Sequence, residues 1–469
     1  MNWNKPPAVA GLAVLLSACA VGPDYHRPEL ALPAHFRDGG ADWSSAAPGD
    51  AQPRGDWWQA FGDPDLDALE HQAADANLDL RIAASRWRQA EALTRQASAA
   101  RWPTISGNAG VTRSGAGRNA AAGGSASGTA DSIGASLAWE LDLWGRVSRT
   151  VEADVASAQA ARGDLETARL SLQAQLATSY FTLRQVDAQR RLLEAAVEAY
   201  QRSLDLTRNR YAGGVASRAD VAQATTQLEA TRAQRVDLDI QRGQLEHAIA
   251  VLLGRTPQDF SLAPRDGTEL ATPPAIAPQL PSTLLQRRPD VAAAERRAAA
   301  ANAQIGVAQA AFFPALQLDA SAGFRSSSLS NLLSVSSRVW SVGPSLAATL
   351  FDAGARSAAK AQAQEGFEQA ADTYRKSVLG ALQDVDDSLV ALQTLASEAD
   401  VEEAALAAAV ETLQLTTNQY KAGTVSYLNV ISAQAAELGA RQNRLNIEAR
   451  RLTATVQLIK SLGGGWNGG

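Results

Sequence analysis

Residue types that carry enzyme or metal chemistry are sparse and scattered in this chain. Ser357 and Lys360 match the Ser-x-x-Lys pattern of acyl-transfer enzymes, but the match stands alone inside a long helical pattern and is best explained by chance. The glycine-rich stretch after Arg113 lacks the Gly-Lys-Ser/Thr ending of a phosphate-binding loop. The histidines show no metal-ligand spacing: His26, His35, His71 and His247. The sequence therefore predicts no enzyme active site, no metal site and no cofactor.

Composition narrows the class of protein further. The chain has 469 residues, of which 46% are hydrophobic, and this is enough to build a packed structure. The formal net charge is -6 and both signs are interspersed, so no basic surface is expected to hold nucleic acid. Because the sequence shows neither an enzyme or metal site nor a surface for nucleic acid, we expect a mechanical function.

The N-terminus has the layout of a secretory signal peptide over residues 1–18, with an apolar stretch at Ala8–Leu16 followed by small residues. Cys19, the only cysteine, closes the run Leu-Ser-Ala-Cys, which resembles the lipobox of bacterial lipoproteins. Cleavage before Cys19 would leave a covalent lipid, such as palmitate, on the new N-terminus. No aspartate follows, which favours the outer membrane. The alternative is an ordinary signal peptide in which Cys19 has no role.

The chain repeats itself with a shift of 209 to 211 residues. Tyr211 recurs as Tyr420, "WELDLWGR" recurs as "ATLFDAGAR", and "ARWPTISGNAG" recurs as "AFFPALQLDASAG". The sequence therefore predicts two copies of one unit, residues 64–253 and 282–462. The other predicted segments are the signal peptide, an acylated extended segment at 19–63, a linker rich in proline and glycine at 254–281, and a glycine-rich tail at 463–469.

Each copy is predicted to contain a helix, a β-hairpin, a long helix, a turn and a returning helix. In the first copy a helix over 64–101 ends before Pro103, and the hydrophobic period then changes from about 3.6 to about 2. From Ser132 to Leu143 apolar residues alternate with small or polar ones, which is typical of a strand with one apolar face. The predicted hairpins span about 104–143 and 315–351, and the predicted tips span about 211–217 and 420–426.

After each hairpin the sequence predicts a very long helix, over about 146–210 and about 353–420. At about 1.5 Å per residue, each would be on the order of 100 Å long. Apolar residues recur at spacings of three, four and seven, which indicates coiled-coil packing. The first helix carries Leu165, Leu172, Leu176, Leu183, Val186, Leu193, Val197, Tyr200 and Leu204, and the second carries Val378, Leu382, Val385, Leu389, Leu392, Leu406, Val410 and Leu413.

Alternating segments of about 10 residues match a tilted membrane strand, although a small soluble sheet on a helical body is the alternative. Four strands leave open edges, which lipid does not tolerate, so the chain is expected to oligomerise. Three copies would close a barrel of about twelve strands. Aromatic residues cluster at the predicted strand ends, as at a membrane interface: Trp102, Trp139, Trp144, Phe312, Phe313 and Phe351.

Several motifs together resemble one family. They are "LSAC", "VGPDYHRP", "WWQAFGDPDLDALEHQAADANLDL", "WELDLWGR", "RYAGGVAS", "RRPDVAAAERRAAAANAQIGVAQAAFFP", "LFDAGAR", "QYKAGTVSYLNV" and "LGGGW". In these the chain is similar to TolC/OprM-type outer-membrane efflux factors of the lipoprotein (NodT-like) branch. The resemblance implies a mainly α, TolC-like fold with membrane β-strands, in which a homotrimer forms a 12-stranded β-barrel in outer-membrane lipid and an α-helical barrel across the periplasm.

The same resemblance implies a function. The protein would be a passive exit duct for drugs or other small molecules, with a role in antibiotic resistance. It would dock to a periplasmic adaptor protein and to an inner-membrane transporter of the RND class.

Roles for the two turns also follow from the resemblance. The region resembles the family's periplasmic gate, in which Asp220 would bond Tyr420 and hold neighbouring hairpins closed. Val425 replaces an arginine that reinforces this latch, and Asn429 and Ser432 replace two aspartates that ring the pore. Closure is therefore expected to rely on the latch and on apolar packing. The tips would meet the adaptor through Gly214, Val215, Ser217, Gly423, Thr424 and Ser426.

Two alternatives share many of these features. A coiled-coil lipoprotein would tether the outer membrane as a spacer without a pore, and a type I secretion duct would carry polypeptides through the same fold. The lipobox and "VGPDYHRP" favour the drug-efflux branch.

Overall fold

The structure is a computed structural model that describes residues 21–30, 55–115, 128–265, 267–274 and 288–464. The chain divides into two compact units. We name them the strand unit (Met1–Leu30, Ser85–Arg162 and Ala293–Lys376) and the helix unit (Ala31–Ala84, Gly163–Ala292 and Ser377–Gly469). Each unit contains segments of both sequence repeats.

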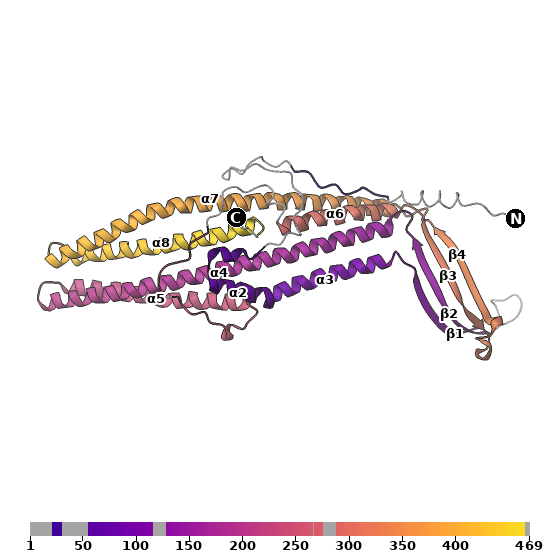
Figure 1. Cartoon of the computed structure of the whole chain (residues 1–469), viewed down its shortest axis with the longest axis horizontal. Helices are drawn as coiled ribbons and strands as arrows, with labels where there is room; N and C mark the ends of the chain where they lie inside the picture. The colour runs from indigo at the N-terminus through magenta and orange to yellow at the C-terminus, as the bar shows by residue number, and fades with distance from the viewer. Residues whose placement is uncertain (1–20, 31–54, 116–127, 266, 275–287, 465–469) are drawn as a thin grey trace. The chain divides into compact units, whose positions relative to one another are not determined.

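The helices follow the order of the repeats (Figure 1). Before the first repeat lies η1 (Trp57–Phe61), and within it lie α2 (Pro64–Ala76), α3 (Leu78–Ala99), α4 (Arg146–Ala212) and α5 (Arg218–Leu252), followed by η2 (Pro257–Asp259). In the second they are α6 (Pro289–Ala310), η4 (Leu329–Asn331), η5 (Val335–Ser337), α7 (Ala355–Ala422) and α8 (Tyr427–Ser461). The helices α4 and α7 have 67 and 68 residues. None of the helices described is both long and apolar enough to cross a membrane.

The first helix differs from the prediction, because Asn77 divides it into α2 and α3. The backbone of Asn77 is extended, with a ψ of 130°. Its side-chain oxygen accepts a hydrogen bond from the backbone nitrogen of Leu80 at 3.0 Å, and its amide donates to the carbonyl of Leu252 at 2.8 Å. Asparagine is one of the best residues to begin a helix, so one side chain ends the first helix and starts the second.

The strand unit contains a four-stranded antiparallel sheet in the order β1-β2-β3-β4 (Figure 1). The strands are β1 (Thr104–Ser114), β2 (Gly128–Leu141), β3 (Ala315–Ser326) and β4 (Arg338–Ala347). One hairpin comes from each repeat, and the two hairpins pair through β2 and β3. Among the described strands, β1 and β4 each have one edge without a partner.

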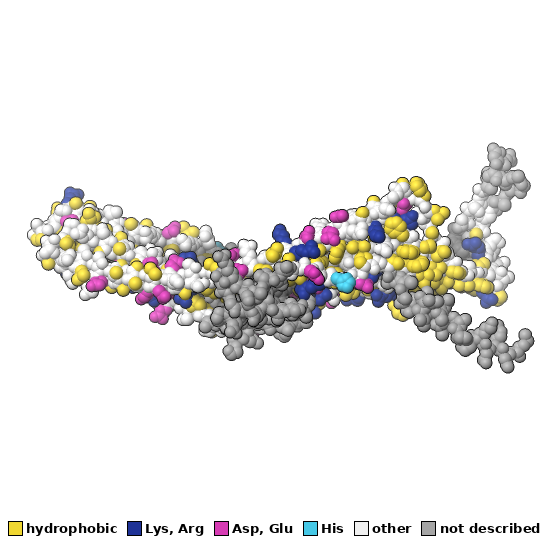
Figure 2. Space-filling view, turned by 90° about the horizontal axis from the view of Figure 1, so that it is seen from above, with side chains coloured by type: hydrophobic (Ala, Val, Ile, Leu, Met, Phe, Trp, Pro, Cys, Tyr) yellow, Lys and Arg dark blue, Asp and Glu magenta, His cyan; other side chains and the backbone are white. Residues whose placement is uncertain are grey.

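The register gives the sheet one largely apolar face and one polar face, because residues paired across strands lie on the same side. Figure 2 shows hydrophobic side chains gathered over these strands. Rows on the apolar face include Ile105–Leu137–Ala320–Val342, Trp139–Leu318–Pro344 and Leu141–Leu316–Leu346. Rows on the polar face include Ser106–Ser136–Ser321–Ser341 and Glu140–Gln317–Ser345.

Gly134 and Gly323 are paired where the two hairpins meet. A Cβ atom on Gly323 would lie 2.4 Å from the carbonyl oxygen of Ile133, and one on Gly134 would lie 2.9 Å from the carbonyl oxygen of Ala322. The close approach of the two backbones therefore requires glycine on both strands.

The core of the helix unit contains the apolar stripe predicted on the first long helix. Leu176 and Leu183 are fully buried, together with Tyr180 and Phe181 on the same helix. The stripe on α7 is less covered, since Val410 is 38% exposed. The helix therefore presents apolar surface that a single chain does not bury.

A buried ionic group joins the start of α2 to the core. Asp63 begins α2 and accepts hydrogen bonds from the backbone nitrogens of Asp65 and Leu66. The Arg265 guanidinium donates to it at 2.7 Å, and the hydroxyl of Tyr180 donates to both its oxygens. Burial raises the pKa of Tyr180, so this hydroxyl stays protonated and remains a donor.

Glu70 on α2 is buried without a partner. The residue has no exposed surface, and neither carboxylate oxygen has a hydrogen-bond partner among the described residues. Burial raises the pKa of Glu70 to about 9. The side chain is therefore a neutral carboxylic acid at pH 7.

Candidate functional site

Two glycine turns connect the helix pairs at the tips. The amide of Gly214 donates to the carbonyl of Tyr211, and the amide of Gly423 donates to that of Tyr420, both at 3.0 Å. The φ angles of the two glycines are +73° and +80°, in the left-handed region that other residues rarely adopt. No atom of the described residues lies within 4 Å of a Cβ built on either glycine, so the backbone conformation rather than lack of space requires glycine.

The structure exposes all the residues predicted to meet an adaptor. Val215 is the most apolar of them and is 68% exposed. The set that lies exposed at the two turns is Gly214, Val215, Ser217, Gly423, Thr424 and Ser426.

Within the part of the single chain that the structure describes, no hydrogen bond joins Asp220 to Tyr420, and a bond between neighbouring copies stays a prediction. The carboxylate of Asp220 instead accepts hydrogen bonds from the backbone nitrogen and the hydroxyl of Ser217, at 2.8 and 2.9 Å. The Ser217 hydroxyl oxygen accepts from the Asp220 nitrogen, which completes a capping box at the start of α5. The hydroxyl of Tyr420 is buried and has no hydrogen-bond partner in the described part of the chain.

Tyr420 is held through its ring, by an arginine that the sequence analysis did not select. The guanidinium carbon of Arg210 lies 4.7 Å from the ring centroid, and Nη1 of Arg210 donates to the carbonyl of Lys421 at 3.1 Å. The ring of Tyr427 lies on Tyr420 at 5.3 Å. These contacts join the end of α4 to the end of α7.

The other predicted gate residues lie close by. Val425 is half-buried and packs against the core that contains Tyr420 and Tyr427. Asn429 and Ser432 are exposed on α8. The surface of α8 that follows the turn is therefore neutral at these two positions.

In the strand unit, an aspartate and an arginine recur where each hairpin joins a long helix. Asp142 accepts hydrogen bonds from the backbone nitrogens of Val147 and Ser148, and so caps α4. In the second repeat Asp352 accepts from the backbone nitrogen of Arg356 and from its side chain. The repeated "WGR" and "GAR" motifs thus stand where each long helix begins.

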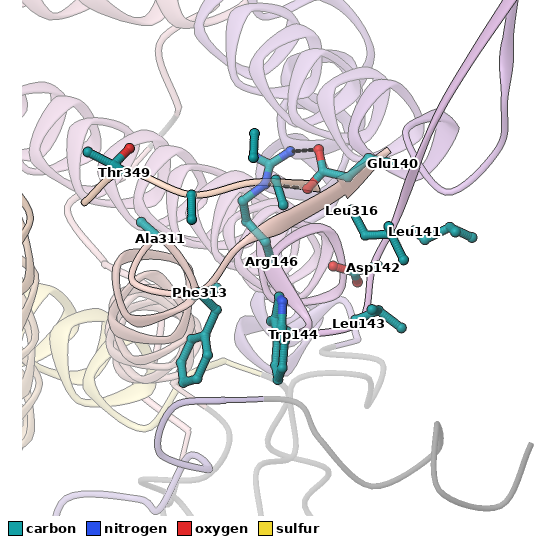
Figure 3. A pocket seen from close by; sticks show the side chains of 14 residues that line it. Glu140, Leu141, Asp142, Leu143, Trp144, Arg146, Ala311, Phe313, Leu316 and Thr349 are labelled. Carbon is teal, nitrogen blue, oxygen red and sulfur yellow. Dashed lines mark hydrogen bonds and ion pairs between the residues drawn. The ribbon is translucent and has the colours of Figure 1, made fainter. Parts of the chain in front are cut away.

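A cavity of about 340 Å³ lies at the first of these junctions (Figure 3). Arg146 donates two hydrogen bonds to the carboxylate of Glu140 on one side of it. On another side Trp144 stacks on Phe313 with centroids 4.7 Å apart and donates to the carbonyl of Pro314. A charged pair and an aromatic pair thus meet where the strands end.

The predicted aromatic band follows the same junctions. Trp102 and Phe351 are 74% and 86% exposed. The six residues lie just before β1 and β3, at the end of β2, or between a strand and the following long helix: Trp102, Trp139, Trp144, Phe312, Phe313 and Phe351.

Cys19 lies outside the described residues, but the segment that follows it is bound to the strand unit. We call Val21–Leu30 the strap. The Val21 nitrogen donates to the carbonyl of Trp144 at 3.2 Å, and Asp24 pairs with Arg149 at 2.8 Å. A Cβ on Gly22 would lie 2.5 Å from the Cα of Gly306 on α6, so the backbone of the strap lies directly against this helix. The strap starts beside the aromatic band.

No group of histidine, cysteine and acidic side chains suited to a metal ion occurs in the described part of the chain.

Two segments of the chain, residues 69–255 and 280–464, match the family described as outer membrane efflux protein. Each segment contains one hairpin and one tip. The chain belongs to this family. Relatives of this efflux protein include the toluene efflux pump outer membrane protein TtgI of Pseudomonas putida, which is 32% identical over 100% of this chain and 99% of the relative. The cation efflux system protein CusC of Escherichia coli is 30% identical over 97% of each chain.

Solved structures agree with the family. The structure of the outer-membrane channel OprN is 31% identical and has a TM-score of 0.88, covering 96% of this chain and 100% of that one. The efflux protein therefore has the TolC-like fold and is an outer-membrane channel component of an efflux pump. Its relatives are named as efflux and channel proteins rather than as enzymes.

Proposed function

We propose that three copies of this efflux protein form a passive exit duct, anchored by a lipid on Cys19 and docked through its tips to a periplasmic adaptor and an inner-membrane transporter of the RND class. The observation that carries the proposal is the four-stranded sheet with one polar face, one apolar face and two edges that no described strand pairs with.

The edges support closure by further copies. An unpaired strand edge leaves backbone amides and carbonyls without partners, which is costly in lipid. The edge strands β1 and β4 have 11 and 10 residues, so their lengths match for pairing between neighbouring copies. The apolar face then meets lipid and the polar face lines the duct.

The helix unit supports the same assembly. Apolar residues on α7 stay exposed in the single chain, and they include Val390, Val401, Val410 and Leu415. Neighbouring copies, which the open sheet already requires, would cover part of this exposed apolar surface.

The strap supports the lipid anchor. Val21, two residues after Cys19, is bonded to Trp144 in the aromatic band. An acyl group on Cys19 would therefore enter the membrane close to the interface marked by the band.

We propose small organic molecules as substrates. The relatives include one named for toluene and one named for cations. Soft transition metals favour thiolate and thioether ligands, but this chain has a single cysteine and a single methionine. The polar face of the sheet offers mainly hydroxyl and amide groups, which suit uncharged and mixed solutes.

Planar-bilayer recording on the purified, lipidated protein tests the duct. We expect discrete conductance steps, with trimers after chemical cross-linking. A spacer lipoprotein gives no steps, and this result would reject the duct. Co-purification with a drug–proton transporter supports the efflux partner, whereas co-purification with an ABC-class transporter supports polypeptide secretion.

A further inference from the structure

Arg210 occupies an unusual position at the ends of two long helices from different repeats. It lies in the last turn of α4, three residues before Gly213. Its side chain covers the Tyr420 ring and reaches the carbonyl of Lys421 in the last turn of α7. A cation is favoured beside such carbonyls, because the C-terminal end of a helix carries partial negative charge.

The contact depends on the ring of Tyr420 and not on its hydroxyl. Tyr420 is 5% exposed, and none of the described residues bonds to its hydroxyl. An aromatic face attracts a guanidinium through its quadrupole, and burial strengthens this attraction. The contact between the two helix ends is therefore a cation–π pair with one hydrogen bond to the backbone.

Other contacts fix the same helices further from the turns. Tyr200 on α4 donates to the carbonyl of Gln434 on α8 at 3.1 Å. The hydroxyl of Tyr427 donates to Ser203 on α4 at 3.1 Å. Arg210 comes after both along α4, so it is the member of this series nearest to the exposed turn.

We infer that Arg210 is a positioning residue for the periplasmic opening of the duct, which we call the mouth and which the tips surround. By holding the second tip of each chain (420–426) to the first (211–217), Arg210 sets the width of the closed mouth. This inference rests on the proposed duct and replaces the latch between Asp220 and the Tyr420 hydroxyl with a clamp on the Tyr420 ring. Moving the α7–α8 pair away from the α4–α5 pair at the mouth requires the ring to leave the guanidinium.

The two repeats differ at this clamp, which is formed at Tyr420 and not at the equivalent Tyr211 among the described residues. In the sequence repeat Tyr211 corresponds to Tyr420, and Gln419 corresponds to Arg210. Tyr211 is 47% exposed, whereas Tyr420 is buried. Only one of the two equivalent tyrosines therefore lies under an arginine among the described residues.

Bilayer conductance of single-site variants tests the clamp. Arg210→Gln and Tyr420→Leu are each expected to increase the open fraction of the channel on the order of threefold to thirtyfold, the range expected for a partly to fully desolvated cation–π contact. The double variant should open no further than either single variant, because both remove the same contact. Arg210→Lys, which keeps the charge, should restore part of the closure.

Two further variants separate the clamp from its alternatives. Arg208→Gln is the matched control, because Arg208 is exposed and pairs only weakly with Asp205 at 3.8 Å. Tyr420→Phe keeps the ring and should open the channel by a much smaller factor than Tyr420→Leu. Equal opening by Tyr420→Phe and Tyr420→Leu would favour the hydroxyl latch and overturn the clamp.

Folding is measured on the same samples. Trimer yield and melting temperature should stay at the wild-type values for Arg210→Gln, since a purely structural role would lower them without changing the conductance of assembled trimers. If Arg210→Gln does not assemble, the comparison of Tyr420→Leu with Tyr420→Phe tests the clamp, because these variants change the ring partner of Arg210 and leave the arginine in place. A wild-type protein without conductance rejects the duct itself, whereas a conducting wild type with an unchanged Arg210→Gln rejects only the clamp.

Discussion

The Tyr180 hydroxyl lies 2.8 and 2.9 Å from the two carboxylate oxygens of Asp63, inside the core of the helix unit. The two residues are 117 positions apart, and the bond ties the start of α2 to the middle of α4. Asp63 is 6% exposed, so few water molecules can replace a lost partner.

Removing this hydroxyl should destabilise the protein. Tyr180→Phe keeps the ring but leaves a buried carboxylate short of one donor, which costs about 1 to 3 kcal/mol. Denaturant unfolding of the detergent-solubilised protein measures the loss. Tyr211→Phe, at an exposed tyrosine, should change the free energy of unfolding by less than about 0.5 kcal/mol. Equal effects of the two variants would contradict the role of the bond.

Because of Glu70, the protein should be more stable at acidic pH than at alkaline pH. Its pKa of about 9 in the folded protein is above the ordinary value of 4.5, so the folded state binds the proton more tightly. The stabilisation relative to an ionised group is complete below about pH 4.5 and is lost as the pH rises toward 9. At pH 7 the lost stability amounts to at most about 3 kcal/mol.

Replacement of Glu70 tests this dependence. Glu70→Leu should stabilise the protein at pH 7 by up to about 3 kcal/mol and flatten the dependence of the melting temperature on pH. Asp75→Asn on the same helix is the control, because Asp75 is exposed. A Glu70→Leu protein that keeps the wild-type pH dependence would show that another group is responsible.

The glycine pair between the hairpins should tolerate no side chain. Gly323→Ala places a Cβ 2.4 Å from the Ile133 carbonyl, and overpacking of this kind typically costs about 1 to 3 kcal/mol. We expect fewer heat-resistant oligomers in outer-membrane fractions. Gly107→Ala is the matched control in β1, where the described structure places no atom within 4 Å of the added Cβ. Similar losses from both variants would argue against the close approach.

Asp220 and Ser217 should behave alike, because they form one capping box. Ser217→Ala and Asp220→Ala are each expected to weaken the start of α5 by about 0.5 to 2 kcal/mol and to speed amide hydrogen exchange there. The two variants should also have the same channel conductance as each other. Ser426 begins α8 without a side-chain cap bond, so Ser426→Ala should leave hydrogen exchange at α8 unchanged. If Asp220→Ala alone raised the conductance, its carboxylate would have a partner outside the box.

The sequence predicted what depends on local pattern. The alternation from Ser132 to Leu143 and the positive-φ glycines Gly214 and Gly423 are local signals, and the structure has strands and turns there. Two local signals were missed although they are readable. They are Asn77, which begins α3, and Ser217-x-x-Asp220, which matches the capping-box pattern.

The remaining contacts could not be predicted from local pattern. Arg210 and Tyr420 lie 210 positions apart, and nothing near either residue indicates the other. The bond of Tyr180 to Asp63 and the approach of Gly134 to Gly323 likewise depend on how distant segments pack. Even the internal repeat misleads here, because it makes Tyr211 and Tyr420 equivalent while their surroundings differ.

The row Ser106–Ser136–Ser321–Ser341 crosses the whole sheet at one height. In the proposed trimer, three such rows would form a belt of hydroxyl groups around the passing solute. A hydroxyl both donates and accepts hydrogen bonds and carries no net charge. At this belt a solute of either charge, or of none, could replace part of its hydration shell with hydroxyl groups. The belt would therefore select little between solutes, and the adaptor and the inner-membrane transporter would select them.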